Sequence, residues 1–372
     1  MSIKNIKHMK ILIFANQLYL GGAERVASLI SNGLNSRNHK VVIAADITNY
    51  PITYHLDNGV KLIDLSHVNK SGFFYKLKRT FERISKRRTI IKKEDPDVII
   101  AFTHQVFFWT LIANIFLRIP LIASDHTAID RDMGTFSNLI RGFFYKYADV
   151  LTILTEKDKQ LLGKKFPNKI VIPNPLTYEV SKVNYNIREK IVLCAGRISY
   201  WQVKGFDRII EIWRKLSSKY PEWKLYIAGP GDNNSIEFLE SLINKYHLSS
   251  CVTLLGQVDD MKSLYQKVGI FALPSRVEGF PMVLIEAMSQ GCPCISFEMN
   301  GAVREIIENG IDGILVDDGD VCAFSRKLDN LMEDYSKRER ISNVAPVHIS
   351  RFSMDNIINI WEKIIVKLLN KS

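Results

Sequence analysis

Short runs in which every residue is apolar alternate along most of the chain with longer segments of helical periodicity. A run that is apolar at every position is typical of a strand buried on both faces, the environment of a parallel sheet covered by helices. In the first half the pattern predicts strands at Lys10–Ala15, Lys40–Ala45, Val98–Ala101, Leu121–Ser124 and Asp149–Leu154. In the second half it predicts strands at Ile191–Ala195, Lys224–Ala228, Val252–Leu255, Ile270–Leu273, Pro293–Ser296 and Gly313–Val316. The predicted fold class is therefore α/β, with two open parallel sheets.

The length of 372 residues suits two domains. Residues 173–175 read Pro-Asn-Pro, and the polar stretch 177–190 follows, so we place the hinge there. We expect Rossmann-like domains over 1–178 and 190–350, followed by a terminal docking helix over 351–372 that could cross back to the first domain. Open α/β domains bind ligands at the carboxyl ends of their strands, so two domains facing each other would form a binding cleft.

The formal net charge of +11 is unusual for a soluble globular protein and indicates a polyanionic partner: nucleic acid, an anionic membrane or a phosphorylated substrate. The cations are densest over 73–93, where Glu82 is the only acid and apolar residues recur at helical spacing. A basic amphipathic helix of this kind commonly lies on an anionic surface. The alternative is a covering helix with an ordinary solvated face. The cations in this segment are Lys76, Lys78, Arg79, Arg83, Lys86, Arg87, Arg88, Lys92 and Lys93, and its apolar residues include Phe74, Leu77, Phe81, Ile84, Ile90 and Ile91.

The apolar run at 11–15 is too short for the core of a signal peptide. The most apolar region, 98–123, is interrupted by His104, Asn114 and Arg118, which disfavours a spanning helix. No C-x-x-C pair occurs among Cys194, Cys251, Cys292, Cys294 and Cys322. These features predict a cytoplasmic protein.

Two glycine-containing turns follow predicted strands. Gly21 and Gly22 precede a predicted helix, whose free N–H groups could bind phosphate. The alternative is a tight turn in which Glu24 favours the helix dipole. Gly229, in Ala-Gly-Pro-Gly-Asp, would let the backbone approach a ligand closely.

The segment 278–286, Glu-Gly-Phe-Pro-Met-Val-Leu-Ile-Glu, is the most specific motif. Glu286 falls within an otherwise apolar helix, where a buried carboxylate needs hydrogen-bond donors. A ribose diol would supply two hydroxyls; the alternative is a structural carboxylate bound by backbone amides. Glu278 precedes the helix and could bind hydroxyls of a sugar.

Arg197 ends one predicted strand and Lys204 follows seven residues later, a spacing that lets both cations converge on a pyrophosphate. Alone, two ordinary surface cations would be the better interpretation. His126 follows another strand end and could donate to a sugar hydroxyl, although a lone His is more often simply solvated. Asp130 and Asp132 form an acidic pair without further acids nearby, so we predict no metal site.

These segments together resemble family 4 glycosyltransferases, which have the GT-B fold. The resemblance covers nearly the whole chain and rests on the segments 21–25, 196–206, 228–232, 278–288 and 309–316. The chain also resembles bacterial transferases that extend undecaprenyl-pyrophosphate oligosaccharides in O-antigen, capsule or N-glycan assembly, including GalNAc-polymerising transferases, at 123–126 and 299–302. Asp125 stands where those enzymes have Glu.

The resemblance implies a role for each matching position. The first domain would bind the acceptor and the second the nucleotide sugar, with UDP favoured. The residues implied in donor binding are Gly21, Gly22, Arg197, Lys204, Gly229, Val258, Glu278, Gly279, Phe280, Pro281 and Glu286. Among them Arg197, Lys204 and Glu278, together with His126 beside the sugar, would act in catalysis. Arg79, Arg83 and Lys86 would meet the acceptor pyrophosphate at the inner face of the cell membrane.

The family transfers sugar with retention of configuration and needs no divalent metal or other cofactor. Two alternatives remain open on sequence alone. One is a GT-B nucleotide-sugar epimerase, and the other is a basic nucleic-acid-binding protein, which would explain the charge but not Glu278 and Glu286.

Overall fold

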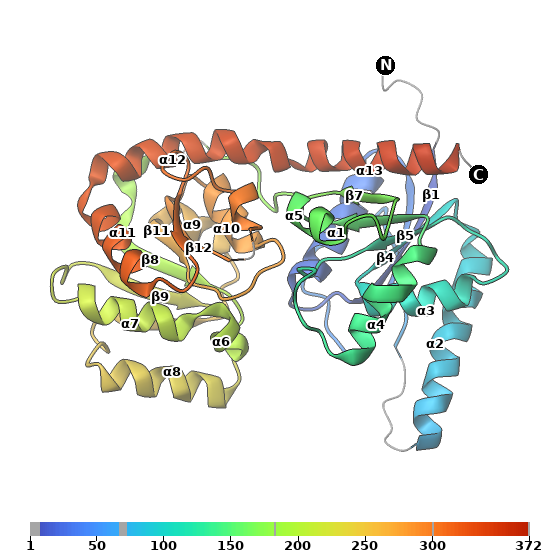
Figure 1. Ribbon diagram of the computed structural model, residues 1–372, viewed down its shortest axis with the longest axis horizontal. Coiled ribbons are helices and arrows are strands. Elements are labelled where there is room, and N and C mark those ends of the chain that lie inside the picture. Colours follow the sequence, from blue (N-terminus) through green and yellow to red (C-terminus); the bar gives the residue numbers. More distant parts are fainter. Residues whose placement is uncertain (1–7, 67–72, 182–183, 300, 371–372) are drawn as a thin grey trace. The chain divides into compact units, whose positions relative to one another are not determined.

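The computed structural model describes residues 8–66, 73–181, 184–299 and 301–370, with the side chains of 73–77 excepted. The chain forms two compact units, residues 1–175 with 354–372 (unit 1) and residues 176–353 (unit 2). Each unit is an open parallel sheet wound by helices (Figure 1). The α/β fold class is therefore confirmed.

Unit 1 contains a seven-stranded sheet of order β3-β2-β1-β4-β5-β6-β7. Its strands are β1 (Lys10–Gln17), β2 (Lys40–Asp46), β3 (Lys61–Asp64), β4 (Val98–Phe102), β5 (Leu121–Ser124), β6 (Val150–Ile153) and β7 (Lys169–Val171). Its helices are α1 (Gly22–Ser36), α2 (Phe73–Glu94), α3 (His104–Asn114), α4 (Thr135–Phe143), the 3-10 turn η1 (Phe144–Tyr147), α5 (Glu156–Leu161) and α13 (Met354–Leu369). Leu12, Phe14, Ile99 and Ala101 of the central strands are buried in the core that α2 and α3 cover.

The terminal helix α13 packs on α1 within unit 1. Gly33 of α1 leaves room for Ile358, which an added Cβ would meet at 2.6 Å. Two polar contacts fix the orientation: His39 Nε2 lies 3.0 Å from Glu362 Oε1, and Arg37 donates to Asp355 over 2.9 Å. Ile358, Trp361, Ile365 and Leu368 recur at helical spacing along α13 and are all buried.

Unit 2 contains a six-stranded sheet of order β10-β9-β8-β11-β12-β13. Its strands are β8 (Glu189–Ala195), β9 (Lys224–Ala228), β10 (Val252–Gly256), β11 (Val268–Leu273), β12 (Cys294–Glu298) and β13 (Ile314–Asp317). Its α-helices are α6 (Trp201–Lys204), α7 (Phe206–Leu216), α8 (Asn233–Lys245), α9 (Met261–Lys267), α10 (Met282–Ser289), α11 (Val321–Glu333) and α12 (Tyr335–Ile349). The 3-10 turns are η2 (Tyr185–Ile187), η3 (Ile198–Tyr200), η4 (Val303–Glu305) and η5 (Ser350–Phe352).

Every predicted strand is present within a few residues of its expected bounds, whereas β3 and β7 were not predicted. Both missed strands are short, lie at the two edges of the seven-stranded sheet and have half-buried residues. An edge strand lacks the continuous apolar run that marks a central one. The expected hinge segment 177–190 lies in unit 2.

The apolar region 98–123 folds as β4, α3 and β5. No helix among the described residues combines the length and hydropathy needed to cross a bilayer. Some sequence-based expectations fall outside the described residues: the side chains of Phe74, Lys76 and Leu77, and the backbone of Asn300.

Candidate functional site

The strand order of unit 2 reverses between β8 and β11, which are neighbours in the sheet. The loops that leave such neighbouring strands diverge to opposite faces of the sheet, and the crevice between them is where α/β proteins bind ligands. Arg197 follows β8 and Glu278 follows β11. Two of the predicted site residues therefore emerge at this switch point.

The Arg197 guanidinium lies over the Tyr200 ring, 5.2 Å from its centroid. Lys204 instead approaches Glu278. Its Nζ lies 2.8 Å from Glu278 Oε1, and Ser275 Oγ donates to the same carboxylate oxygen over 2.7 Å. The aliphatic stem of Lys204 lies against Gly196, where an added Cβ would meet it at 3.1 Å. The structure thus brings together a basic residue and an acidic residue that are 74 positions apart in the sequence.

Close backbone packing holds these loops at the sheet edge. Gly229 follows β9, and an added Cβ there would collide with the carbonyl oxygen of Gly196. Ile198 N–H donates to the Pro230 carbonyl over 2.7 Å, and Gly229 N–H donates to Gly256 over the same distance. The glycine predicted for close approach to a ligand is therefore also required for close approach between two loops of the protein. Val258 is half-buried farther along the same edge.

Residues 279–281 link Glu278 to the start of α10. Gly279 is half-buried, while Phe280 and Pro281 are buried. The Phe280 ring packs edge-on against Phe352, with centroids 5.3 Å apart. Pro281 directly precedes the helix, as its fixed φ favours.

Glu286 on α10 is 1 % exposed. Thr177 Oγ1 donates to its Oε1 over 2.7 Å, and Tyr265 Oη donates to its Oε2 over 3.2 Å. Both donors are side-chain hydroxyls, and neither was expected from the sequence. The buried carboxylate therefore has protein partners before any ribose binds.

In unit 1 the strand order reverses between β1 and β4. The glycine turn follows β1, and α1 begins at the exposed Gly22. Gly21 N–H donates to Tyr54 Oη over 2.8 Å, and Tyr54 Oη donates to the Gly21 carbonyl over 3.0 Å. Of the two glycine N–H groups predicted to bind phosphate, the first therefore has a protein partner.

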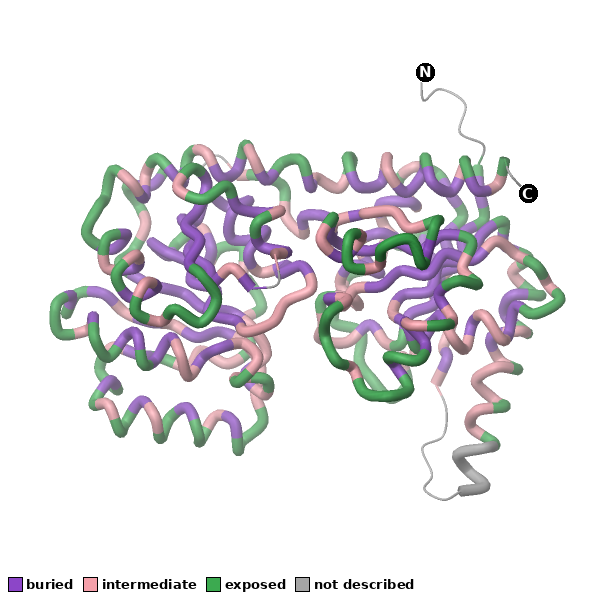
Figure 2. The backbone as a smooth tube through the Cα atoms, in the orientation of Figure 1, coloured by how far each residue is buried: buried purple, intermediate pink, exposed green. Residues whose placement is uncertain are grey.

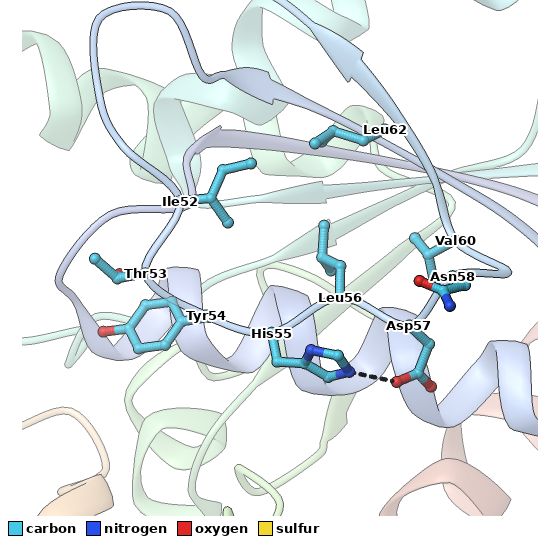
Figure 3. A pocket seen from close by; sticks show the side chains of 9 residues that line it. All are labelled: Ile52, Thr53, Tyr54, His55, Leu56, Asp57, Asn58, Val60 and Leu62. Carbon is cyan, nitrogen blue, oxygen red and sulfur yellow. Dashed lines mark hydrogen bonds and ion pairs between the residues drawn. The ribbon is translucent and has the colours of Figure 1, made fainter. Parts of the chain in front are cut away.

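Tyr54 belongs to the loop between β2 and β3, whose residues line an open pocket beside α1 (Figure 3). Thr53 joins the same turn: its N–H donates to the Leu18 carbonyl over 3.0 Å, and its Oγ1 accepts from Leu20 N–H over 3.2 Å. Asn32 of α1 holds the other side of the loop by donating to the His55 carbonyl over 3.0 Å. The loop thus fastens the glycine turn to α1.

His126 follows β5, and its ring stacks on Phe102 with centroids 4.9 Å apart. Its Nε2 lies 2.9 Å from Ser124 Oγ, and its Nδ1 lies 3.2 Å from Asn174 Oδ1. Thr152 Oγ1 donates to Ser124, so we assign the Ser124 proton to His126 Nε2 and the imidazole proton to Nδ1. Burial lowers the pKa of His126 to about 4, which leaves the ring neutral at physiological pH.

Asp125, 1 % exposed, is held within unit 1. Its Oδ2 accepts from Arg141 Nε over 3.0 Å and from Tyr145 Oη over 2.8 Å. Arg141 also donates to the carbonyls of Thr127 and Ala128, and so braces the chain just after His126.

His104, which opens α3 after β4, was not singled out from the sequence. It is 4 % exposed, and among the described residues neither ring nitrogen has a hydrogen-bond partner. Burial lowers its pKa. The preceding Thr103 has φ +75°, a left-handed conformation uncommon for a β-branched residue. Neither property is visible in a sequence pattern, because both depend on tertiary packing: Thr103 N–H, for example, donates to the Ser124 carbonyl of β5 over 2.8 Å.

The basic segment forms α2, which extends beyond the sheet of unit 1 (Figure 1). Phe81, expected on its apolar face, is 73 % exposed, whereas Arg87 is 5 % exposed and lies over the Phe14 ring. Ile84, Ile90 and Ile91 pack into the core as expected, so among the described side chains the predicted apolar face is wrong at Phe81. Burial and the neighbouring Arg83 lower the pKa of Arg87 to about 10.

The three cations predicted to meet a pyrophosphate, Arg79, Arg83 and Lys86, are half-buried. Arg83 lies over the Trp109 ring, 6.0 Å from its centroid, and burial lowers its pKa. Lys86 Nζ donates to the Ser66 carbonyl over 3.0 Å.

The whole basic excess of the chain lies in unit 1. This unit has 29 Lys and Arg against 16 Asp and Glu, a formal charge of +13. Unit 2 has 21 against 23, a formal charge of −2. A polyanionic partner would accordingly be attracted to unit 1.

The two acidic residues of the 127–134 loop, Asp130 and Asp132, contact other residues of unit 1. Asp132 accepts from Gly134 N–H and Asn138 Nδ2, and Asp130 lies 3.6 Å from Lys157 Nζ. Across the part of the chain that the structure describes, no group of three or more His, Cys, Asp or Glu residues is arranged to hold a metal ion.

Comparison with known proteins identifies the family. Residues 20–179 match the family model for Glycosyltransferase Family 4, and residues 179–347 match the model for Glycosyl transferases group 1. The amylovoran biosynthesis glycosyltransferase AmsD of Erwinia amylovora is 30 % identical over 93 % of this chain and 96 % of its own. The chain is a family 4 glycosyltransferase.

A further relative and a solved structure agree with this assignment. The first is a Campylobacter jejuni α-1,4-N-acetyl-D-galactosaminyltransferase named for a diNAcBac-PP-undecaprenol-linked acceptor, 29 % identical over 97 % of this chain and 99 % of its own. The second is Anabaena HepE in complex with UDP and glucose, with a TM-score of 0.77, 19 % identity, and coverage of 97 % of this chain and 100 % of that one. The structural likeness confirms the GT-B fold of this glycosyltransferase. These matches give no support to an epimerase or a nucleic-acid-binding protein.

Proposed function

We propose that this glycosyltransferase moves a hexosyl or N-acetylhexosaminyl group, with retention, from a UDP-sugar to an undecaprenyl-pyrophosphate-linked glycan in bacterial surface polysaccharide assembly. The observation that carries the donor assignment is the ion pair of Lys204 and Glu278 at the β8–β11 switch point of unit 2, where Arg197 also follows a strand end. The solved structure of HepE, which shares the fold, contains UDP and glucose, and its bound UDP supports a UDP-sugar as the donor.

In this proposal Arg197 and Lys204 bind the donor diphosphate and stabilise the charge that develops as it leaves. Lys204 is paired with Glu278 in the structure, so the diphosphate would share or replace that partner. Glu278 would then be available for hydroxyls of the donor sugar. Glu286 would accept from the ribose, and the Gly22 N–H at the start of α1 would contribute to diphosphate binding.

The donor sugar would lie beside the neutral imidazole of His126. Since Nε2 accepts from Ser124 and Nδ1 donates to Asn174, a sugar hydroxyl would have to exchange with one of these partners or meet the ring edge. A leaving phosphate oxygen would accept the proton of the acceptor hydroxyl. No carboxylate is then required as a nucleophile, and no metal is needed.

Two findings support the acceptor assignment: the C. jejuni relative is named for an undecaprenol-PP-linked acceptor, and the basic excess of the chain lies in unit 1. A membrane-bound lipid pyrophosphate is the kind of polyanion that α2 would attract. Arg79, Arg83 and Lys86 would contact it while α2 lies on the anionic inner face of the cell membrane.

A direct test measures thermal stabilisation by a panel of UDP- and GDP-sugars, because a ligand that binds the folded state raises Tm. The stabilising donor is then incubated with undecaprenyl-pyrophosphate-linked glycan, and the product is analysed by mass spectrometry. We expect one UDP-sugar to raise Tm and to add one or more hexose or N-acetylhexosamine units. Stabilisation by GDP-sugars alone would overturn the UDP assignment, and transfer only to free saccharides would overturn the acceptor assignment.

A further inference from the structure

Helix α4 of unit 1 carries an unusual exposed stripe. Phe136, Leu139 and Phe143 recur at spacings of three and four residues, so they share one helical face. Their exposed fractions are 47 %, 53 % and 46 %, and Tyr147 just beyond the helix is 52 % exposed. The opposite face is anchored, since Ile140 is fully buried and Arg141 is held by Asp125.

The stripe is firmly supported by rings beneath it. Phe136 packs edge-on against Phe108 of α3 with centroids 5.4 Å apart, and Trp109 lies 6.5 Å from the same ring. Phe143 contacts Phe144 at 5.2 Å and Tyr147 at 6.0 Å. The apolar surface is therefore a fixed part of the fold and not a loosely attached loop. Much of α4 is exposed to solvent, as Figure 2 shows.

Cations border the C-terminal end of the stripe. Lys146 Nζ lies 3.8 Å from the Phe143 ring centroid and 4.9 Å from that of Tyr147. Lys165 Nζ would lie 3.9 Å from a Cβ on Gly142. The acidic Asp132 is at the other end, where it caps the turn before α4. Both lysines belong to the unit that holds the whole basic excess.

We propose that the α4 stripe, Phe136, Leu139, Phe143 and Tyr147, inserts into the interfacial layer of an anionic bilayer, with Lys146 and Lys165 meeting lipid headgroups. This proposal rests on the proposed function, which places the acceptor in a membrane. Half-exposed aromatic rings beside lysines suit the membrane interface, where one end of the side chain meets apolar lipid and the other meets water and phosphate. A nucleic-acid surface would need the cations but would leave Leu139 exposed to water.

The stripe acts differently from α2. Charge attraction by α2 is screened by salt, since the Debye length falls to about 3 Å at 1 M ionic strength. Burial of the α4 side chains in lipid is not screened. The two contributions can therefore be separated by measuring vesicle binding at low and high salt.

The test is flotation with vesicles containing 30 % phosphatidylglycerol, using the full chain and the double variant Leu139→Ser/Phe143→Ser. We expect this variant to lose at least 10-fold in vesicle affinity at 0.1 M NaCl and all detectable binding at 1 M NaCl. The matched control is Ile187→Ser/Val347→Ser in unit 2, which changes two residues that are 71 % and 67 % exposed and should bind as the parent does. Circular dichroism melts verify that each variant folds.

Trp109, beside Phe136, provides a second measurement. Vesicles with brominated acyl chains should quench part of the parent's fluorescence, and this part should be absent from Trp109→Phe. Unchanged vesicle affinity of the α4 variant, or no Trp109 quenching, would overturn the proposal. Concentration-dependent dimers that the α4 variant abolishes would overturn it in favour of a second copy of the chain. Sugar transfer by the parent enzyme to detergent-solubilised acceptor is measured in parallel. If the parent transfers sugar but does not bind vesicles, the proposed membrane contact of α4 is wrong while the proposed function stands.

Discussion

Glu286 shows how a residue-scale expectation changes once its neighbours are known. From the sequence it was an isolated carboxylate in an apolar helix; in the structure it accepts from the hydroxyls of Thr177 and Tyr265. Replacement by Ala would remove the carboxylate that accepts from both hydroxyls, and the loss of a buried hydrogen bond costs about 1–3 kcal/mol. Loss of stability and loss of binding would then be confounded.

The sharper variant is Glu286→Gln, which keeps the shape and one acceptor oxygen. We expect it to weaken UDP-sugar binding by about 10-fold, because a charged acceptor contributes roughly 1.5–3 kcal/mol to a hydrogen bond. Calorimetric titration measures the affinity and a thermal melt the stability. Parent-like affinity in a well-folded variant would exclude the ribose role and leave Glu286 a structural carboxylate.

Arg197 and Lys204 carry the proposed stabilisation of the leaving diphosphate. Arg197→Ala and Lys204→Ala should each lower kcat/KM for the donor by about 10²-fold, the usual loss when a group that stabilises developing charge is removed. Lys215→Ala, on the exposed side of α7, is a control that removes a cation from the same unit. Near-normal turnover in both site variants would remove these residues from the mechanism.

The sequence located Lys204 and Glu278 because each follows a recognisable strand. It could not reveal that they form an ion pair, nor that Thr177 reaches Glu286 across 109 residues. Such partners are set by which strands are neighbours in the sheet. A single hydroxyl in a polar stretch gives no pattern from which that order can be deduced.

At the scale of elements, the loop between β2 and β3 controls the glycine turn through Tyr54. The turn was predicted from its glycines, but the loop that fastens it was not, since β3 was missed. Tyr54→Phe removes the hydroxyl that pairs with both polar groups of Gly21. We expect a loss of about 1 kcal/mol of stability and faster amide hydrogen exchange over residues 18–22.

Tyr50→Phe is the matched control in the same loop. Its ring stacks on Tyr19 with centroids 6.3 Å apart, and this contact needs no hydroxyl. Hydrogen exchange followed by mass spectrometry should therefore differ from the parent only for Tyr54→Phe. Equal protection of residues 18–22 in both variants would show that the Tyr54 hydroxyl does not hold the turn.

At the scale of the whole molecule, continuous apolar runs predicted both parallel sheets because strands buried on two faces have little compositional freedom. The net charge also became informative only at this scale. The charge of +11 on the whole chain does not indicate where a polyanionic partner would bind, whereas the charge of +13 on unit 1 does. The surface of α4 was not predicted, since exposed and buried apolar residues look alike in a sequence.

Metal independence is a whole-enzyme prediction. Because Arg197 and Lys204 would supply the positive charge at the diphosphate, a divalent cation is not required for its departure. Turnover after dialysis against EDTA should equal that of the untreated enzyme, with added Mg²⁺ or Mn²⁺ changing it less than 2-fold. Loss of activity in EDTA that either cation restores would contradict the proposed mechanism.

Stability should also depend on pH through His126. Its folded pKa of about 4 lies below the value of about 6.5 expected in an unfolded chain, so the unfolded state binds more protons between these values. Stability from this group is therefore complete above pH 6.5 and is lost as pH falls toward 4, by about 2 kcal/mol at pH 4.5. Urea unfolding at pH 7 and pH 4.5 measures the loss in the free energy of unfolding. The variant His126→Gln cannot titrate at this position, so its loss between the two pH values should be smaller than the parent's by about 2 kcal/mol. Equal losses in parent and variant would show that His126 is not held neutral by the fold.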